Sequence, residues 1–264
     1  MKKILIIGKK SFLGSNLKTY LSKYYEVEQF SFEKVIKKSN NFFKKYCHII
    51  NTAIHPRYIK NTYNKRYDLD FRFLNKFKKI NFYYIFLNSR KIYKQKFNIT
   101  EKSKLYPIDN YSKNKLRTEK FIIKKFGKLI ISLRISNIIG KRIFNNVRNN
   151  HKLFFDNFLI YQNKNKEYIF YNQFKDFLSI DQFCKIVFMI IKKNINGIYN
   201  VSLSRKIYIS EIVKWLDKDL FKRIKFLKST KGSFTLSNKK LLKKIKIKLT
   251  KIQLKTFCKK LNIN

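Results

Sequence analysis

The sequence predicts an α/β fold in which helices cover both faces of a parallel sheet. Short apolar runs alternate with helical segments of about 10 to 15 residues along the first half of the chain. Most of these runs are apolar at nearly every position, as in strands that are buried on both faces. The first run ends at a glycine that leads into a helix, which is typical of sheets that bind a ligand at their carboxyl edge.

The first half is expected to supply five strands. The runs that predict them are Lys3–Ile7, Glu26–Phe30, Cys47–Ala53, Phe82–Leu87 and Leu129–Ile135. Apolar residues at helical spacing predict helices between them. These helices are Phe12–Tyr24, a segment that begins at Ser31, a Tyr-rich segment that ends near Lys79, and Asn110–Phe126. Their alternation with the strands predicts a doubly wound parallel sheet of the Rossmann type.

After Gly140 the expected elements become shorter, and polar linkers at 145–150 and 163–167 separate them. The expected helices are Leu153–Leu159, Ile180–Ile191, Ser210–Leu216, Asn238–Lys243 and Lys251–Leu261, and the expected strands are Tyr168–Tyr171 and Gly197–Ser202. We therefore expect residues 1–142 to form a nucleotide-binding domain that also receives residues 172–202. Residues 143–264 are expected to form a small, discontinuous C-terminal α/β lobe that binds the substrate.

The chain is strongly basic, with 62 Lys and Arg against 15 Asp and Glu and a formal charge of +47. Such a charge is typical of proteins that bind nucleic acid or anionic membranes. However, 52 of the basic residues are lysines, and they are spread over the whole chain. Lysine, like the abundant Asn, Ile, Phe and Tyr, has AT-rich codons, so we attribute the charge to genome composition and expect no nucleic-acid partner.

Other classes of protein are excluded by composition and spacing. The hydrophobic content of 44% is too high for a chain that stays disordered through low hydrophobicity. No apolar run approaches the length of a membrane span. The three cysteines and three histidines lack the spacing of a metal or redox site. We expect a cytoplasmic protein without a structural metal.

A phosphate-binding loop is predicted between the first strand and the first helix, at Gly8–Gly14. Backbone N–H groups and the helix dipole favour an anion at such a turn. Gly8 permits the tight turn and Gly14 permits close packing of helix on strand, whereas Ser11 stands where a third glycine would be expected. The expected contacts of this loop with a dinucleotide are Gly8, Ser11, Phe12, Leu13 and Gly14.

The end of the second strand does not select between NAD and NADP. An acidic residue there would bind the adenosine ribose of NAD. Here the strand ends at Phe30 and Ser31, with Lys34 one turn later. The choice of cofactor is left open, and the lysine favours NADP slightly.

Tyr111 and Lys115 lie four residues apart and therefore share one face of the predicted helix. A nearby ammonium lowers the pKa of a phenol from its usual value of about 10, which makes Tyr111 a candidate proton donor or acceptor. Ser89 lies at the end of the fourth strand, at the edge where parallel sheets bind ligands. Because the chain has 17 tyrosines, a Tyr-x-x-x-Lys sequence alone is weak evidence for a catalytic site. The evidence is stronger here because the pair follows the phosphate loop and Ser89 in the chain.

Together these motifs resemble the extended short-chain dehydrogenase/reductases of the NAD-dependent epimerase/dehydratase type, which mostly act on nucleotide-activated sugars. The resemblance covers almost the full length of the chain. The segments that carry it are Gly8–Leu17, Asn51–Ala53, Phe86–Tyr93, Tyr111–Lys115, Leu133–Gly140, Lys175–Ile180 and Gly197–Val201.

The resemblance implies an enzyme of polysaccharide biosynthesis that uses NAD or NADP to reduce or epimerise a nucleotide-linked sugar. Tyr111 would be the general acid/base, Ser89 would bind the same substrate oxygen, and Lys115 would hold the nicotinamide ribose. The residues implied to bind cofactor from the third strand are Asn51, Thr52 and Ala53, and those implied to bind substrate are Asn137 and Lys175. A homodimer is left open.

The chain also departs from the family pattern. Ser11 replaces the middle glycine, and Asp70 stands where the family often has an asparagine. Arg90 and Lys91 replace the acidic pair of the dehydratases, which argues against dehydration, and Lys175 stands in place of an arginine. The alternative is a non-catalytic dinucleotide-binding or nucleic-acid-binding protein derived from this family, against which the joint presence of serine, tyrosine and lysine argues.

Overall fold

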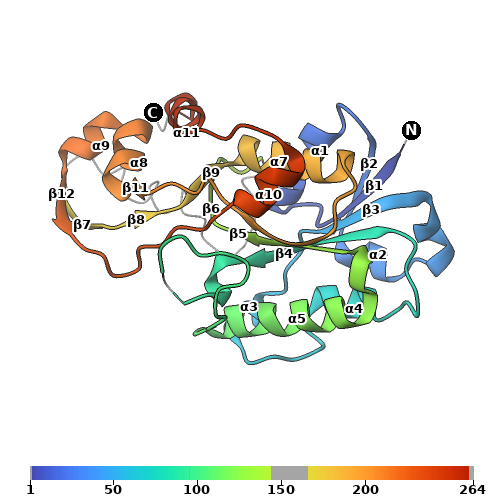
Figure 1. Ribbon diagram of the computed structural model, residues 1–264. Coiled ribbons are helices and arrows are strands. Elements are labelled where there is room, and N and C mark those ends of the chain that lie inside the picture. Colours follow the sequence, from blue (N-terminus) through green and yellow to red (C-terminus); the bar gives the residue numbers. More distant parts are fainter. Residues whose placement is uncertain (1, 95, 144–165, 262–264) are drawn as a thin grey trace.

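A computed structural model describes residues 2–94, 96–143 and 166–261, and its centre is a six-stranded parallel sheet (Figure 1). The strand order is β10-β5-β4-β3-β1-β2. The strands are β1 (Lys3–Ile7), β2 (Glu26–Phe30), β3 (Tyr46–Asn51), β4 (Tyr83–Ser89), β5 (Ile130–Ile135) and β10 (Gly197–Val201). Helices cover both faces, which confirms the predicted doubly wound fold.

The two helical layers follow from the alternation of side chains along the strands. Ile4 and Ile6 of β1 face one core, while Leu5 and Ile7 face the other. The first core is covered by α1 (Phe12–Leu21), α7 (Ile180–Lys192) and α10 (Lys239–Ile245). The second is covered by α2 (Phe32–Ile36), α4 (Leu69–Leu74) and α5 (Asn110–Phe126). Because both faces of the strands are buried, they carry apolar residues at successive positions.

One expected helix is wrong. The segment that ends near Lys79 contains two short helices, α3 (Pro56–Lys60) and α4, joined by turns. The break has a local cause, because the carboxylate of Asp68 accepts a hydrogen bond from Phe71 N at 2.9 Å and begins a new helix. Three short 3₁₀ helices complete this half: η1 (Asn40–Lys45), η2 (Arg90–Ile92) and η3 (Gly127–Leu129).

The C-terminal part, at the left of Figure 1, is built from short strand pairs and helices. The pairs are β6 (Asn137–Ile139) with β9 (Phe177–Ser179), β7 (Tyr168–Asn172) with β12 (Ile224–Lys228), and β8 (Phe174–Lys175) with β11 (Ile207–Tyr208). The helices are α8 (Ile209–Leu216), α9 (Lys218–Lys222) and α11 (Lys251–Lys260). The expected helix Leu153–Leu159 lies outside the described residues. The division of the chain at residue 142 stays a prediction.

The strand order reverses beside β1. The chain passes through α1 to β2 at one edge and then returns through α2 to β3 on the other side of β1. In doubly wound sheets, ligands bind at the carboxyl ends of the strands at such a reversal. The loops that follow β1 and β3 meet at this point of the molecule.

Polar side chains buried in the described part of the fold have structural surroundings. His48 is fully buried and stacks on Tyr83, with ring centroids 5.2 Å apart, and burial lowers its pKa to about 4. Across the described ranges, no group of His, Cys, Asp and Glu is arranged to hold a metal ion. None of the helices in those ranges has both the length and the apolar character that crossing a membrane requires.

The helix α5, which carries Tyr111 and Lys115, is fixed to the sheet by a buried ion pair. Arg134 of β5 donates from Nη2 to Glu119 Oε2 at 2.6 Å and from Nε to Oε1 at 3.1 Å. The hydroxyl of Ser132 donates to Glu119 Oε1 at 2.5 Å. The two charged side chains are only 4% and 2% exposed, so each depends on the other for its charge to be balanced.

We predict that Glu119→Ala lowers the free energy of unfolding by about 3–5 kcal/mol, because it leaves the Arg134 guanidinium buried without a carboxylate. Urea denaturation followed by circular dichroism measures the loss. Asp219→Ala is the control, because it removes an exposed ion pair with Lys222. The side chain of Asp219 is 83% exposed and that of Lys222 is 75% exposed. Equal losses in the two variants would contradict the role given to the buried pair.

Candidate active site

Two glycines allow the turn after β1 to approach the end of β3. Gly8 has φ +117°, and a Cβ on it would lie 2.5 Å from Thr52 Oγ1 and 3.0 Å from Ala53 N. A Cβ on Gly14 would lie 2.5 Å from both Ser11 Oγ and Thr52 Oγ1. No side chain fits at either position without moving the loop, so the close approach depends on both glycines.

The hydroxyl of Ser11, at the position of the missing third glycine, is used inside the turn. Ser11 is the N-cap of α1, and its Oγ accepts from Gly14 N at 3.0 Å. Thr52 Oγ1 donates to Ile7 O at 2.7 Å and lies 2.5 Å from Ser11 Oγ, which also donates to Gly8 O at 3.2 Å. The cap uses the N–H of Gly14, whereas the N–H groups of Phe12 and Leu13 at the start of the helix have no acceptor within it and could donate to an anion.

Two adjoining cavities lie over this turn and share Ser11, Thr52, Ala53 and Ile54. The smaller, of about 180 Å³, brings the loop together with the predicted tyrosine and lysine. Its remaining lining residues are Phe12, Leu13, Asn51, Leu87, Tyr111, Lys115 and Arg142. The larger, of about 660 Å³, extends toward the end of β2, and its lining includes Gly8, Lys9, Lys10, Ser31, Lys37 and Arg72.

These cavities fit a dinucleotide. Residues of the glycine turn and of the N-terminus of α1 line both cavities, and a pyrophosphate would be bound there with the two nucleoside halves to either side. Lys115 and Tyr111 lie only in the smaller cavity, so the nicotinamide half would occupy that one.

Lys115 is held by a buried carboxylate. Its side chain is 7% exposed, and its Nζ lies 3.7 Å from Asp70 Oδ2 and 4.5 Å from the centre of the Phe86 ring. Asp70 Oδ1 in turn accepts from Asn51 Nδ2 at 2.9 Å and from the Tyr84 hydroxyl at 2.7 Å. The departure from the family asparagine therefore gives the lysine a counter-ion.

A second carboxylate, Asp68, belongs to the same buried cluster. It accepts from the Thr118 hydroxyl at 2.5 Å and from the Tyr63 hydroxyl at 3.0 Å. Burial, with the neighbouring Asp70, raises the pKa of Asp68 to about 6. Sequence reasoning missed this residue, although an Asp-x-Asp sequence before a helical segment is visible at 68–70.

The remaining predicted residues lie outside the two cavities. Ser89 ends β4, and its Oγ accepts from Lys91 N at 3.2 Å. Asn137 begins β6 and Lys175 ends β8. The structure thus brings the predicted cofactor residues other than Gly14 and the Tyr111–Lys115 pair into these two linings, and it does not bring Ser89, Asn137 or Lys175 into them. Sequence reasoning also missed Arg142, which follows Gly140 closely in the chain.

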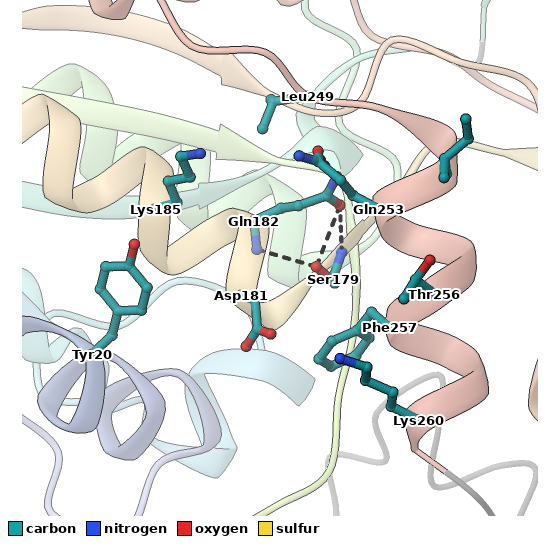
Figure 2. Close-up of a pocket in the computed structure, with 11 residues that line it drawn as sticks. Tyr20, Ser179, Asp181, Gln182, Lys185, Leu249, Gln253, Thr256, Phe257 and Lys260 are labelled. Atoms are coloured by element: carbon teal, nitrogen blue, oxygen red, sulfur yellow. Dashed lines mark hydrogen bonds between the residues drawn. The ribbon is translucent and has the colours of Figure 1, made fainter.

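A third cavity, of about 390 Å³, lies between α1, α7 and α11 (Figure 2). It contains neither the glycine loop nor the tyrosine–lysine pair. Ser179 and Gln182 in its wall form a capping box at the start of α7, and Gln182 also donates to Thr250 O at 3.1 Å. Gln182 thus joins the start of α7 to the start of α11, and because the cavity lacks both motifs we do not assign the active site to it.

The sheet, its reversal point and the glycine turn define a dinucleotide-binding protein of the Rossmann type. A family model described as the NAD dependent epimerase/dehydratase family matches residues 4–202, and the chain belongs to this family. No curated protein sequence matches the chain significantly.

Three solved structures illustrate the likeness in fold. A UDP-N-acetylglucosamine 4-epimerase from Methanobrevibacter ruminantium M1 is 18% identical with a TM-score of 0.76, covering 98% of this chain and 96% of its own. RMD from Pseudomonas aeruginosa, complexed with NADPH, is 16% identical with a TM-score of 0.73 and coverages of 98% and 97%. A UDP-glucuronic acid 4-epimerase from Bacillus cereus, in complex with UDP-glucuronic acid and NAD, is 20% identical with a TM-score of 0.72 and coverages of 94% and 94%.

We predict that Gly8→Ala weakens cofactor binding at least about 10-fold, because its Cβ would push the turn away from Thr52 and Ala53. Fluorescence titration with reduced cofactor measures the dissociation constant. Gly127→Ala is the matched control, because Gly127 also has a positive φ of +49° but has no atom within 4 Å of an added Cβ. Equal weakening in both variants would show that strain alone, without the contact at the turn, explains the effect.

A second prediction concerns pH. The folded protein binds the proton of Asp68 more tightly than the unfolded chain, because the pKa rises from 3.8 to about 6. The stabilisation from the protonated carboxyl is therefore complete below about pH 4 and is lost as the pH rises to about 6, by up to about 3 kcal/mol.

Asp68→Asn should remove this slope from denaturation curves recorded between about pH 4 and about pH 6.5. Asp217→Asn is the control, because Asp217 caps α9 in the same way but is not fully buried. A wild-type slope that persists in Asp68→Asn would contradict the assignment.

Proposed function

We propose that the chain is an NAD(P)-dependent enzyme that reduces or epimerises a nucleotide-activated sugar, with Tyr111 as its general acid/base. The observation that carries the proposal is the single cavity that contains the phosphate loop, the end of β3, Tyr111 and Lys115. A non-catalytic dinucleotide-binding protein would have no need of a tyrosine and a buried, charge-balanced lysine beside the nicotinamide position.

Lys115, Tyr111 and Ser89 would have different roles in the reaction. Lys115 is kept in place by Asp70 in the same cavity as Tyr111 and would hold the nicotinamide ribose, as the family resemblance implies. The phenol would give a proton to a sugar carbonyl oxygen during reduction, or its phenolate would take one from a hydroxyl during oxidation. Ser89 would hydrogen-bond the same oxygen, as the family resemblance implies. A bound nicotinamide would supply or accept the hydride.

The lining of the larger cavity supports NADP as the cofactor. Cations lie around the expected position of the adenosine ribose, namely Lys9, Lys10, Lys37 and Arg72, and Glu33 is the one carboxylate in that lining. Arg72 is held over the Phe32 ring, 5.1 Å from its centre. A ribose 2′-phosphate would be stabilised by these charges. Lys34, from which the sequence argument began, is not part of this lining.

The substrate class rests on the family and on what its members bind. The Bacillus cereus protein binds UDP-glucuronic acid, and the Methanobrevibacter protein is described in complex with UDP-N-acetylmuramic acid. Arg90 and Lys91 stand where an acidic pair would support water elimination, so we propose reduction or epimerisation in place of dehydration. We further propose that the protein works in the cytoplasm and has no nucleic-acid partner.

We predict that Tyr111→Phe lowers kcat by about 10²- to 10⁴-fold, because the proton transfer loses its donor, while the cofactor dissociation constant changes little. The assay is a screen of nucleotide sugars with NADH and with NADPH, which also tests the cofactor preference. Tyr106→Phe is the control, because Tyr106 is 54% exposed. Unchanged turnover in Tyr111→Phe would refute the assignment of the general acid/base.

A further inference from the structure

The smaller cavity over the glycine turn is lined by two cations, Lys115 and Arg142, and by no carboxylate. Asp70 lies outside this lining, but its Oδ2 is only 3.7 Å from the Nζ of Lys115. The two side chains are 6% and 7% exposed, so water screens their charges little. A ligand in this cavity therefore meets an ion pair and not an isolated lysine.

The surroundings of Asp70 fit a charged carboxylate. Its Oδ1 accepts hydrogen bonds from Asn51 Nδ2 at 2.9 Å and from the Tyr84 hydroxyl at 2.7 Å, while Oδ2 faces the ammonium of Lys115. All three partners act as donors, and an ionised carboxylate only accepts. Lys115 has no other carboxylate as an ion-pair partner among the described residues. The balance of its charge thus depends on Asp70.

This balance has a consequence for a nicotinamide cofactor, because its two forms differ in charge at the ring. The oxidised nicotinamide ring is cationic, whereas the reduced ring is neutral. The nicotinamide half is expected in the cavity that contains Tyr111 and Lys115. An unbalanced ammonium there would repel the oxidised ring and have little effect on the reduced one.

We propose that Asp70 sets the relative affinity for oxidised and reduced cofactor, by cancelling the charge of Lys115 beside the nicotinamide. This inference rests on the proposed function and adds to it a residue that stands where the family often has a neutral asparagine. Cancelling the charge makes the affinities for the two forms more nearly alike. An enzyme that takes a hydride from a sugar and returns it to the same sugar needs both forms to stay bound, so the ion pair favours epimerisation over reduction.

The test is a calorimetric titration of four proteins that differ in the charge of the pair: the wild type, Asp70→Asn, Lys115→Met and the double variant. The ligands are NAD⁺, NADH, NADP⁺ and NADPH, and the quantity compared is the ratio of the dissociation constants of the oxidised and reduced forms. Asp70→Asn leaves the ammonium unbalanced and should raise this ratio by about 10-fold. Lys115→Met leaves the carboxylate unbalanced and should lower it by a similar factor.

The double variant distinguishes charge from position. It carries no charge at either residue, so its ratio should return to the wild-type value even though the loss of Lys115 weakens the binding of both forms. Should Asp70→Asn not fold, Lys115→Met and the double variant still test the charge of Asp70, because they differ only at that residue. In thermal melting the double variant should be more stable than either single variant, because no buried charge is left unpaired.

Glu26→Gln is the control, because it makes the same change of net charge at an exposed ion pair with Lys3, at the amino end of the sheet. Its ratio should equal that of the wild type. A purely structural role of Asp70 would weaken both forms alike, so a ratio that is constant across the four proteins overturns the inference and leaves the proposed function standing. A wild type that binds none of the four ligands overturns the proposed function and this inference with it.

Discussion

The site depends on how closely the turn after β1 approaches the end of β3. Thr52 Oγ1 lies only 2.5 Å from the place that a Cβ on either Gly8 or Gly14 would take, so a side chain at either glycine would displace it. The hydroxyl pair of Ser11 and Thr52 then ties the start of α1 to the carbonyl of Ile7. This contact places the N-terminus of α1 at the reversal point of the sheet. The cavity over that N-terminus is also lined by Tyr111 and Lys115.

Four carboxylates of this basic chain, Asp68, Asp70, Glu119 and Asp176, are buried inside it. Asp70 balances Lys115, Glu119 balances Arg134, and Asp176 is fully buried where it accepts hydrogen bonds from the N–H groups of 203, 204 and 236. A surface acid can be lost at little cost, because exposed ion pairs stabilise weakly. A buried acid that balances a charge cannot be lost so easily, because its removal leaves an unpaired cation. A drift toward lysine would therefore remove surface acids first, which is consistent with the net charge of +47 on an otherwise ordinary fold.

The sequence predicted the sheet well because buried parallel strands are apolar on both faces. Such apolar runs can be recognised without knowing which strands pair with one another. It also predicted α5 with its observed bounds, since Asp109 caps its start and Gly127 ends it with a positive φ. The split of the Tyr-rich segment was missed because its cause is a single side-chain cap at Asp68. The pairing of Asp70 with Lys115 was also out of reach, because 45 residues separate partners that only the fold brings together. The roles of Ser89, Asn137 and Lys175 still rest on the family resemblance.

The buried cations of the described structure fall into two kinds. Lys115 and Arg134 have carboxylates of their own, and each pair joins α5 to a neighbouring element and holds it in place. Arg90 and Lys175 are only partly buried and have no carboxylate partner within the described ranges, although Arg90 stacks on the buried ring of Phe234. A structural cation is balanced when the chain folds, whereas a binding cation is balanced when the ligand arrives, and the cost of leaving it unbalanced is recovered as affinity. Lys115 and Arg134 are of the first kind, and their ion pairs hold the helix that carries Tyr111 against α4 and β5.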